Sequence, residues 1–280
     1  VEGPQPDRPE RERDDSVAGG GEVKFGSLFA GIVGFDLGLE RAGMECKWQV
    51  EIDDFCNRVL EKHWPHVKRY RDVREVGKHN LEPVDLICGG FPCQDLSSAG
   101  QRKGITLGGR SSLYREMLRI IGDLRPKYSI FENVSALLTG GNGEWFHRFL
   151  SDLAEVGLDA EWQSIPSGGL GAPHERERTW IIAYPSESRR GGSLFEGHIK
   201  IRRDLGKHIW TDRYLGSKNP WFDWETDFTW KEFHGEPSVS RKNDGVPNGA
   251  HRVGGCGNAV MPQIAEIIGR VIMEILTPGR

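Results

Sequence analysis

The sequence contains no hydrophobic run near the roughly 18 residues that a membrane-spanning helix needs, and no apolar segment of signal-peptide type at its N-terminus. Its five cysteines, at positions 46, 56, 88, 93 and 256, form an odd set without Cys-x-x-Cys spacing. This pattern argues against a disulfide framework and a structural zinc site, and we expect no metal. The cysteine pattern favours a reducing, intracellular setting. The lack of a long hydrophobic run favours a protein without membrane association.

The sequence also lacks an excess of positive charge, because its formal net charge is -4. Charge is nevertheless uneven, and residues 186–218 carry eight Lys and Arg against four Asp and Glu. A local basic face can bind phosphates even on an acidic protein. An ordinary solvated face explains the same charges equally well.

The chain of 280 residues suits one large domain that carries a smaller insert. Residues 1–22 are polar and rich in Pro, Arg and Glu, and we predict a disordered tail. From residue 23 onward, short apolar runs (24–29, 48–52, 84–88, 128–131 and 180–183) alternate with amphipathic segments (34–42, 55–63, 113–124 and 145–156). Strands that alternate with helices predict an α/β fold with a doubly wound, mostly parallel sheet.

This rhythm stops after Tyr184-Pro185, and residues 184–252 are rich in Trp, Phe, Gly and charge. The aromatic side chains of this insert form either a small core of their own or a surface on which bases stack. Helical periodicity returns at 264–276, ahead of Thr277-Pro278-Gly279. We therefore predict a large domain over 23–183, an inserted domain over 184–252, and a segment 253–280 that returns to the large domain.

A glycine-containing turn, Phe29-Ala30-Gly31-Ile32-Val33-Gly34, follows the first predicted strand. Glycine at such a turn lets a ligand approach the backbone closely, although a turn that simply needs small residues looks the same. Glu51 ends the second predicted strand and could accept hydrogen bonds from ribose hydroxyls. With Asp72-Val73 at the edge of the same pocket, these residues indicate a nucleoside-bearing cofactor.

The run Gly90-Phe91-Pro92-Cys93-Gln94 directly follows the buried strand predicted over 84–88. Strand ends in open α/β sheets gather ligands and chemistry, so the Cys93 thiol is either a nucleophile or a small buried hydrophobe. Glu132 follows the strand predicted over 128–131 and either caps a helix or supplies a proton. Between them, residues 97–110 form a long loop rich in Gly and Ser, which is typical of a functional or disordered segment.

These motifs occur in the order in which the cytosine-C5 DNA methyltransferases have them, and the sequence strongly resembles that family. The resemblance rests on Phe-x-Gly at 29–31, Gly-Phe-Pro-Cys-Gln at 90–94, Glu-Asn-Val at 132–134, Arg-x-Arg at 176–178 and Gly-Asn-Ala-Val at 257–260. It runs from about residue 23 to 183 and from about 253 to 276. It implies the class I methyltransferase fold, and it makes the insert the target recognition domain.

The resemblance implies transfer of a methyl group from S-adenosylmethionine to C5 of a cytosine flipped out of duplex DNA. By this resemblance Cys93 adds to C6 of the base, Glu132 donates to N3, Arg178 holds O2, and Arg176 anchors the loop or a phosphate. The loop at 97–110 would close over the flipped base. The residues implied to line the cofactor pocket are Phe29, Gly31, Gly34, Glu51, Ile52, Asp72, Val73, Pro92 and Asn258.

One residue of the cofactor turn departs from the family's pattern, because Val33 stands where glycine is usual. A β-branched residue adopts a positive φ only at a cost, whereas a helical φ at Val33 would remove the steric objection. Cofactor affinity therefore depends on the conformation of this residue.

The resemblance also implies a role in DNA methylation, with duplex DNA as the partner. It implies a monomer that acts in the cytoplasm of a bacterial cell or a phage-infected host. It leaves open a restriction endonuclease that acts on the same site without a stable complex.

Three alternative functions remain. A tRNA-methylating relative would carry a Cys-Phe-Thr signature, which the sequence lacks. An amino-methyltransferase is recognised by Asn-Pro-Pro-Phe, which Asn219-Pro220-Trp221-Phe222 matches incompletely. A catalytically impaired DNA-binding relative is the third.

Overall fold

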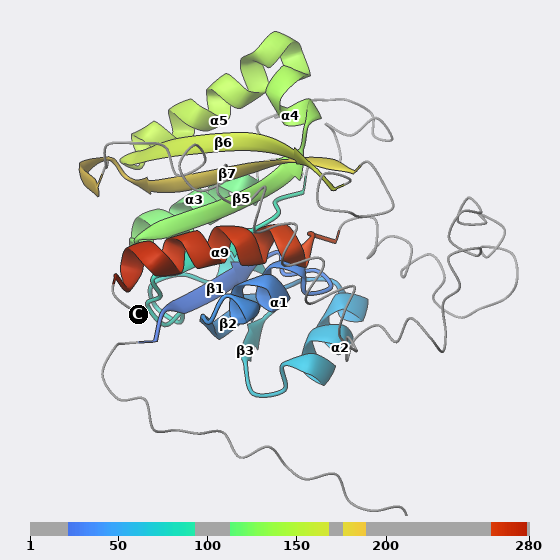
Figure 1. Cartoon of the computed structure of the whole chain (residues 1–280). Coiled ribbons are helices and arrows are strands. Elements are labelled where there is room, and N and C mark those ends of the chain that lie inside the picture. Colours follow the sequence, from blue (N-terminus) through green and yellow to red (C-terminus); the bar gives the residue numbers. More distant parts are fainter. Residues whose placement is uncertain (1–21, 93–112, 168–175, 189–258, 279–280) are drawn as a thin grey trace, which may run out of the picture.

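The computed structural model describes residues 22–92, 113–167, 176–188 and 259–278. Seven strands form one sheet in the order β3-β2-β1-β4-β5-β7-β6, in which β7 alone runs antiparallel to its neighbours (Figure 1). The strands are β1 (Lys24–Leu28), β2 (Glu45–Val50), β3 (Lys68–Tyr70), β4 (Leu86–Gly89), β5 (Tyr128–Val134), β6 (Leu158–Pro166) and β7 (Glu177–Pro185). This arrangement confirms the predicted α/β class and its mostly parallel sheet.

Helices cover both faces of the sheet, because alternate residues of its central strands point to opposite sides. On β4, Ile87 packs into the core beneath α3 and α5, whereas Leu86 packs into the core beneath α1 and α9. The helices are α1 (Gly34–Arg41), α2 (Asp54–His63), α3 (Leu113–Leu124), α4 (Ala136–Thr139), α5 (Glu144–Glu155) and α9 (Pro262–Leu276), with short 3₁₀ turns η1 (Val73–Glu75), η3 (Gly140–Gly143) and η5 (Ser186–Ser188). The continuous apolar runs in the sequence reflect this burial on both faces.

The predicted helices and strands are found, with differences at their ends that have physical causes. β5 continues through Val134, so the prediction that Glu132 follows the strand is wrong; three further residues pair with β7. β2 lies over Glu45–Val50 and not over 48–52, because its polar first half pairs with β1 from Lys24 onward. Strands β3 and β6 were not predicted, since the first is short and polar and the second lies at the sheet edge with few buried side chains.

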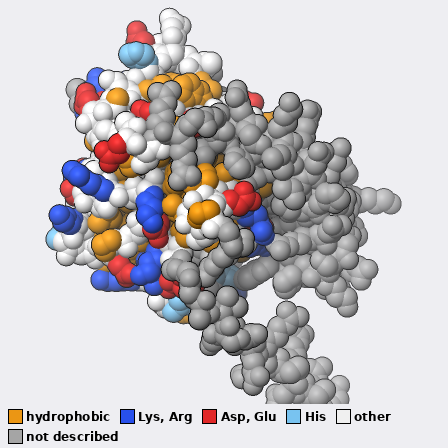
Figure 2. All heavy atoms as spheres, turned by 60° about the vertical axis from the view of Figure 1, so that its left-hand side comes forward, with side chains coloured by type: hydrophobic (Ala, Val, Ile, Leu, Met, Phe, Trp, Pro, Cys, Tyr) orange, Lys and Arg blue, Asp and Glu red, His pale blue; other side chains and the backbone are white. Residues whose placement is uncertain are grey.

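Several predicted regions fall outside the described residues, including most of the tail, the 97–110 loop and nearly all of the inserted domain. The domain boundaries therefore stay predictions. Over the described part of the face in Figure 2, basic and acidic side chains are interspersed. Among the described helices, none is both long enough and apolar enough to span a membrane.

Helix α9 lies against α1, although more than 200 residues separate them in the sequence (Figure 1). Gly38 makes this contact possible, because a Cβ built there would lie 2.4 Å from the Pro262 carbonyl oxygen and 2.6 Å from the Ala265 Cβ. Both distances are shorter than atoms tolerate. Helix α9 therefore packs closely against α1, the helix that follows the predicted cofactor turn.

Replacing Gly38 with alanine is expected to lower the free energy of unfolding by about 1–3 kcal/mol, because the added methyl group overpacks the α1–α9 contact. Gly122→Ala on α3 is the matched control, since a Cβ there meets no atom within 4 Å. That variant should gain about 0.5–1 kcal/mol from helix propensity. Urea denaturation measures both; equal stabilisation by the two substitutions would contradict the close packing.

Candidate active site

The carboxyl ends of three neighbouring strands meet at one edge of the sheet. Leu28 of β1 pairs with Gly89 of β4, and Gly89 pairs with Phe131 of β5. The turn from Phe29, the run from Gly90 and the last residues of β5, from Glu132 onward, therefore begin side by side. Open α/β sheets bind ligands at this edge.

Glu132 is a buried carboxyl group at this edge, with 7% of the residue exposed. The antiparallel pairing of β5 with β7 places Val134 opposite Arg178, and Arg178 Nε lies 3.1 Å from Glu132 Oε1. Arg176 is half-buried, and its charge also acts on Glu132. The structure thus brings together three of the predicted catalytic residues.

Burial raises the pKa of Glu132 to about 7, although the charges of Arg178 and Arg176 act in the opposite direction. Removing a carboxylate from water costs more than these two cations return. A carboxyl group with this pKa holds a proton for part of the time near neutral pH. Glu132 can therefore donate a proton to a base or a hydrogen bond to a ligand.

The run that leads to Cys93 packs against this carboxyl group. A Cβ built on Gly90 would lie 3.0 Å from Glu132 Oε2, so the glycine permits the close approach. Asn133 Nδ2 donates a 3.2 Å hydrogen bond to the carbonyl oxygen of Phe91. Phe91 itself is buried, and its ring stacks on Phe149 with centroids 5.4 Å apart. Both the backbone and the side chain of Phe91 are thus fixed beside Glu132.

Pro92 is half-buried at the end of this run, and Cys93, the next residue, lies outside the described residues. Sequence analysis did not assign a role to Asn133 or Phe91. The signal was present in the Glu-Asn-Val and Gly-Phe-Pro-Cys-Gln motifs, whose second residues are the ones that contact each other. The other three thiols for which the structure gives an environment, Cys46, Cys56 and Cys88, are buried and unpaired.

Glu51 joins the predicted cofactor turn to the end of β2. Its Oε2 accepts a 2.8 Å hydrogen bond from the Gly31 amide, and its Oε1 accepts one of 2.8 Å from the Asp53 amide. Sequence analysis predicted that this carboxylate binds ribose hydroxyls. Carboxylate oxygens accept more than one hydrogen bond each, so its role in the turn is compatible with that prediction.

The remaining predicted cofactor residues that follow β2 and β3 have different surroundings. Ile52 is 63% exposed, an unusual state for a large aliphatic side chain, and it directly follows Glu51. Asp72 caps η1 and forms an ion pair with Arg74, which lowers the pKa of Asp72. The Val73 side chain is buried in the core, so only its backbone could contact a ligand.

Three further residues that were predicted to line the cofactor pocket lie in the turn and at the start of α1. Phe29 is half-buried with φ 54°, and Gly31 has φ 58°. Gly34 begins α1, where a Cβ would lie 2.2 Å from the carbonyl oxygen of Val260. Asn258, two residues before that valine, lies outside the described residues.

Among the described residues, no cluster of three or more His, Cys, Asp or Glu could hold a metal ion.

Val33 adopts φ 80° and ψ 21°, the left-handed conformation that glycine favours. The helical φ that would have removed the steric objection is therefore not adopted. A β-branched residue in this region costs on the order of 1–3 kcal/mol. The Val33 side chain packs against the core beneath α1 and α9, which offsets part of that cost.

The strain at Val33 is measurable by comparing two variants of that position. Val33→Ala keeps a Cβ at the positive φ, whereas Val33→Gly removes it, and neither keeps the branched side chain. We expect Val33→Gly to be about 1 kcal/mol more stable than Val33→Ala in urea denaturation. At positions with negative φ the order is the reverse, so a more stable alanine variant would contradict the left-handed conformation.

The raised pKa of Glu132 predicts a dependence of stability on pH. Because its folded-state pKa of about 7 exceeds the ordinary 4.5, folding takes up a proton, and this contribution to stability is lost as the pH rises through that window. The loss is at most about 3.5 kcal/mol, at about 1.4 kcal/mol for each pKa unit. Glu132→Gln cannot ionise and should lack this dependence. Urea denaturation across the window measures it, and identical pH profiles would refute it.

Comparison with known proteins gives a family for the chain. The family model described as C-5 cytosine-specific DNA methylase matches residues 23–223. The Type II methyltransferase M2.BsuMI of Bacillus subtilis (strain 168) is 34% identical over 165 residues, which are 58% of this chain and 42% of that protein. M.FnuDI of Fusobacterium nucleatum is 32% identical over 190 residues, 67% of this chain and 55% of that protein. The chain thus spans about half the length of these relatives.

A solved structure agrees in fold. A protein described as a prophage-encoded DNA modification methyltransferase from E. coli superposes with a TM-score of 0.52 and 24% identity, covering 61% of this chain and 49% of that one. At this identity the likeness shows the fold alone. The family model, in contrast, matches well over half of the chain and includes every motif from the cofactor turn to Arg178. The chain therefore belongs to the C-5 cytosine-specific DNA methylase family.

Proposed function

We propose that this protein is a DNA (cytosine-5-)-methyltransferase that uses S-adenosylmethionine as methyl donor. The observation that carries the proposal is the Glu132 carboxyl group, buried beside Arg178 and against Gly90, three residues before Cys93. A proton donor with a pKa of about 7, against the run that leads to a candidate nucleophile, suits a ring that must be attacked and protonated together.

The proposed reaction begins with the Cys93 thiolate, which adds to C6 of a cytosine. Negative charge would develop on the ring as the C6–S bond forms, and Glu132 would donate its proton to N3. Arg178 would hold O2 of the base and the Glu132 carboxylate that remains. C5 would then take the methyl group of the donor, whose S–CH3 bond breaks and which leaves as S-adenosylhomocysteine. Loss of the C5 proton to a base, expulsion of the Cys93 thiolate and return of the N3 proton to the Glu132 carboxylate would restore the neutral aromatic ring. Arg176 would anchor the neighbouring loop or a phosphate.

S-adenosylmethionine would supply the methyl group, and the residues at the adjoining strand ends suit it. The Gly31 turn allows a close backbone approach, the Glu51 carboxylate keeps acceptor capacity, and exposed Ile52 offers an apolar surface to a base. Phe29, Gly34, Asp72, Val73, Pro92 and Asn258 complete the proposed pocket.

The substrate we propose is duplex DNA, from which the target cytosine is flipped out at a cost of a few kcal/mol. The inserted segment 184–252 would read the DNA sequence, and the loop at 97–110 would close over the base. We infer a monomer that acts in the cytoplasm of a bacterial cell or a phage-infected host. A restriction endonuclease with the same target would act without forming a stable complex.

Adduct formation tests this proposal. The target is first mapped by bisulfite sequencing of plasmid DNA from cells that express the protein. A duplex with 5-fluorocytosine at that position should then form a complex with the protein that resists denaturation, because fluorine replaces the proton that must leave C5. Cys93→Ser should abolish the complex. Cys88→Ala is the matched control, since Cys88 is fully buried on β4 and should not be needed.

The outcomes separate the alternatives. DNA binding without an adduct and without 5-methylcytosine would favour the catalytically impaired relative and refute the proposal. Methylation of tRNA and not of DNA would identify the tRNA-methylating branch. An adduct that persists in Cys93→Ser would refute the assignment of the nucleophile.

A further inference from the structure

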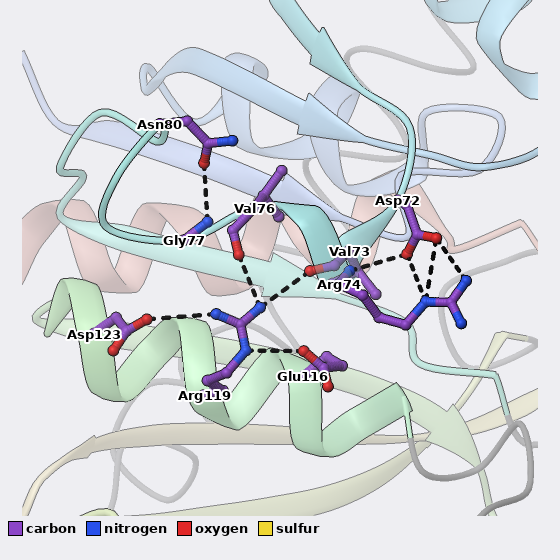
Figure 3. Close-up of polar contacts among 9 residues, drawn as sticks. All are labelled: Asp72, Val73, Arg74, Val76, Gly77, Asn80, Glu116, Arg119 and Asp123. Carbon is purple, nitrogen blue, oxygen red and sulfur yellow. Dashed lines mark hydrogen bonds and ion pairs between the residues drawn. The ribbon is translucent and has the colours of Figure 1, made fainter.

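Arg119 is an arginine of α3 with 39% of its side chain exposed, and the proposed chemistry does not use it. It lies between α3 and the segment that follows β3, which begins with the predicted cofactor residues Asp72 and Val73 (Figure 3). Its Nη2 donates hydrogen bonds to two main-chain carbonyl oxygens, that of Val73 at 3.2 Å and that of Val76 at 2.8 Å. One guanidinium group thus binds both ends of η1.

The rest of the guanidinium group is held by its own helix. Nε donates to Glu116 Oε2 at 2.9 Å, and Nη1 donates to Asp123 Oδ2 at 3.4 Å. These acidic residues lie one turn before and one turn after Arg119, so they orient the planar group toward η1 (Figure 3). A lysine could not reproduce this arrangement, because it has one nitrogen in place of three.

The backbone around η1 is shaped to receive the arginine. A Cβ built on Gly77 would lie 3.0 Å from Arg119 Nη1, so the glycine leaves room for the guanidinium group. The Val73 and Val76 side chains are buried in the core, which leaves their carbonyl groups to turn toward α3. Other contacts hold the same segment from its own side of the fold: the Arg74 amide donates to Asp72 Oδ1 at 3.0 Å, and Asn80 Nδ2 donates to the Glu75 carbonyl oxygen at 3.1 Å. Arg119 adds the hydrogen bonds that join η1 to α3.

We propose that Arg119 is a positioning residue for the adenosine side of the cofactor pocket. By holding the carbonyl groups of Val73 and Val76, it sets the orientation of the Asp72–Val73 backbone without touching the ligand. Hydrogen bonds from a charged group contribute more than neutral ones, and their loss would let η1 pivot away from the edge of the sheet. This inference rests on the proposed function, because it takes that edge to bind S-adenosylmethionine.

Calorimetric titration with S-adenosylhomocysteine tests the proposal, because this probe carries the same adenosine and is not turned over. Arg119→Ala and Arg119→Lys should each weaken binding by about tenfold or more. Gly77→Ala perturbs the same contact from the opposite side and should act in the same direction. Glu116→Gln is the matched control; it removes the charge of an exposed ion pair but keeps an oxygen that can accept from Arg119 Nε. Both carbonyl contacts are therefore kept, and binding should change by less than about twofold.

DNA affinity, measured by fluorescence anisotropy, separates positioning from general damage. In the Arg119 variants it should stay within about twofold of the unmodified protein, whereas KM for S-adenosylmethionine should rise by more than kcat falls. Unchanged binding of S-adenosylhomocysteine in Arg119→Ala, or an equal loss of cofactor and DNA binding, would overturn the inference. If the unmodified protein itself does not bind S-adenosylhomocysteine, the proposed function fails, which is a different result.

Discussion

The pairing of β5 with β7 sets the geometry of the candidate active site, because it buries Glu132 beside Arg178. In an all-parallel sheet the strand next to β5 would present its own carboxyl end at this edge. The antiparallel β7 instead begins there, so Arg178, its second residue, and Arg176, which directly precedes the strand, lie at this edge. The ion pair follows from strand direction. Its second consequence is the raised pKa of Glu132, since the same burial that holds the pair removes the carboxylate from water.

Backbone groups at the sheet edge are fixed by polar and charged side chains. Glu51 accepts from two amides, Asn133 donates to the Phe91 carbonyl group, and Arg119 donates to two carbonyl groups of the η1 region. Arg71 does the same for the Ile52 carbonyl oxygen, at 2.7 Å. Loops gain a defined shape in this way without a core of their own. The residues that would touch a ligand are therefore supported by others whose side chains are already engaged.

Sequence alone predicted the sheet, its main helices and the motif residues, because buried strands and amphipathic helices leave clear periodicities and the motifs are local. It could not predict how these residues use their hydrogen bonds. The Glu51 carboxylate was assigned to a ribose, yet it also binds the Gly31 and Asp53 amides. In the sequence Arg119 is one of several charged residues in the amphipathic segment 113–124, and its carbonyl partners lie 43 and 46 residues away. Such contacts depend on tertiary structure and leave no local pattern.

The cofactor turn shows how the fold maintains an unfavourable backbone. Phe29, Gly31 and Val33 all have positive φ, and two of these three residues carry a Cβ. A conformation of this kind persists only where surrounding contacts determine it. Here the Glu51 carboxylate holds the Gly31 amide, and α1 is fixed from its first residue by the segment around Val260. Both ends of the turn are therefore anchored, and Val33 must adopt whatever φ connects them. The side chain that the family usually omits is tolerated because the α1–α9 packing, and not the turn itself, sets the geometry.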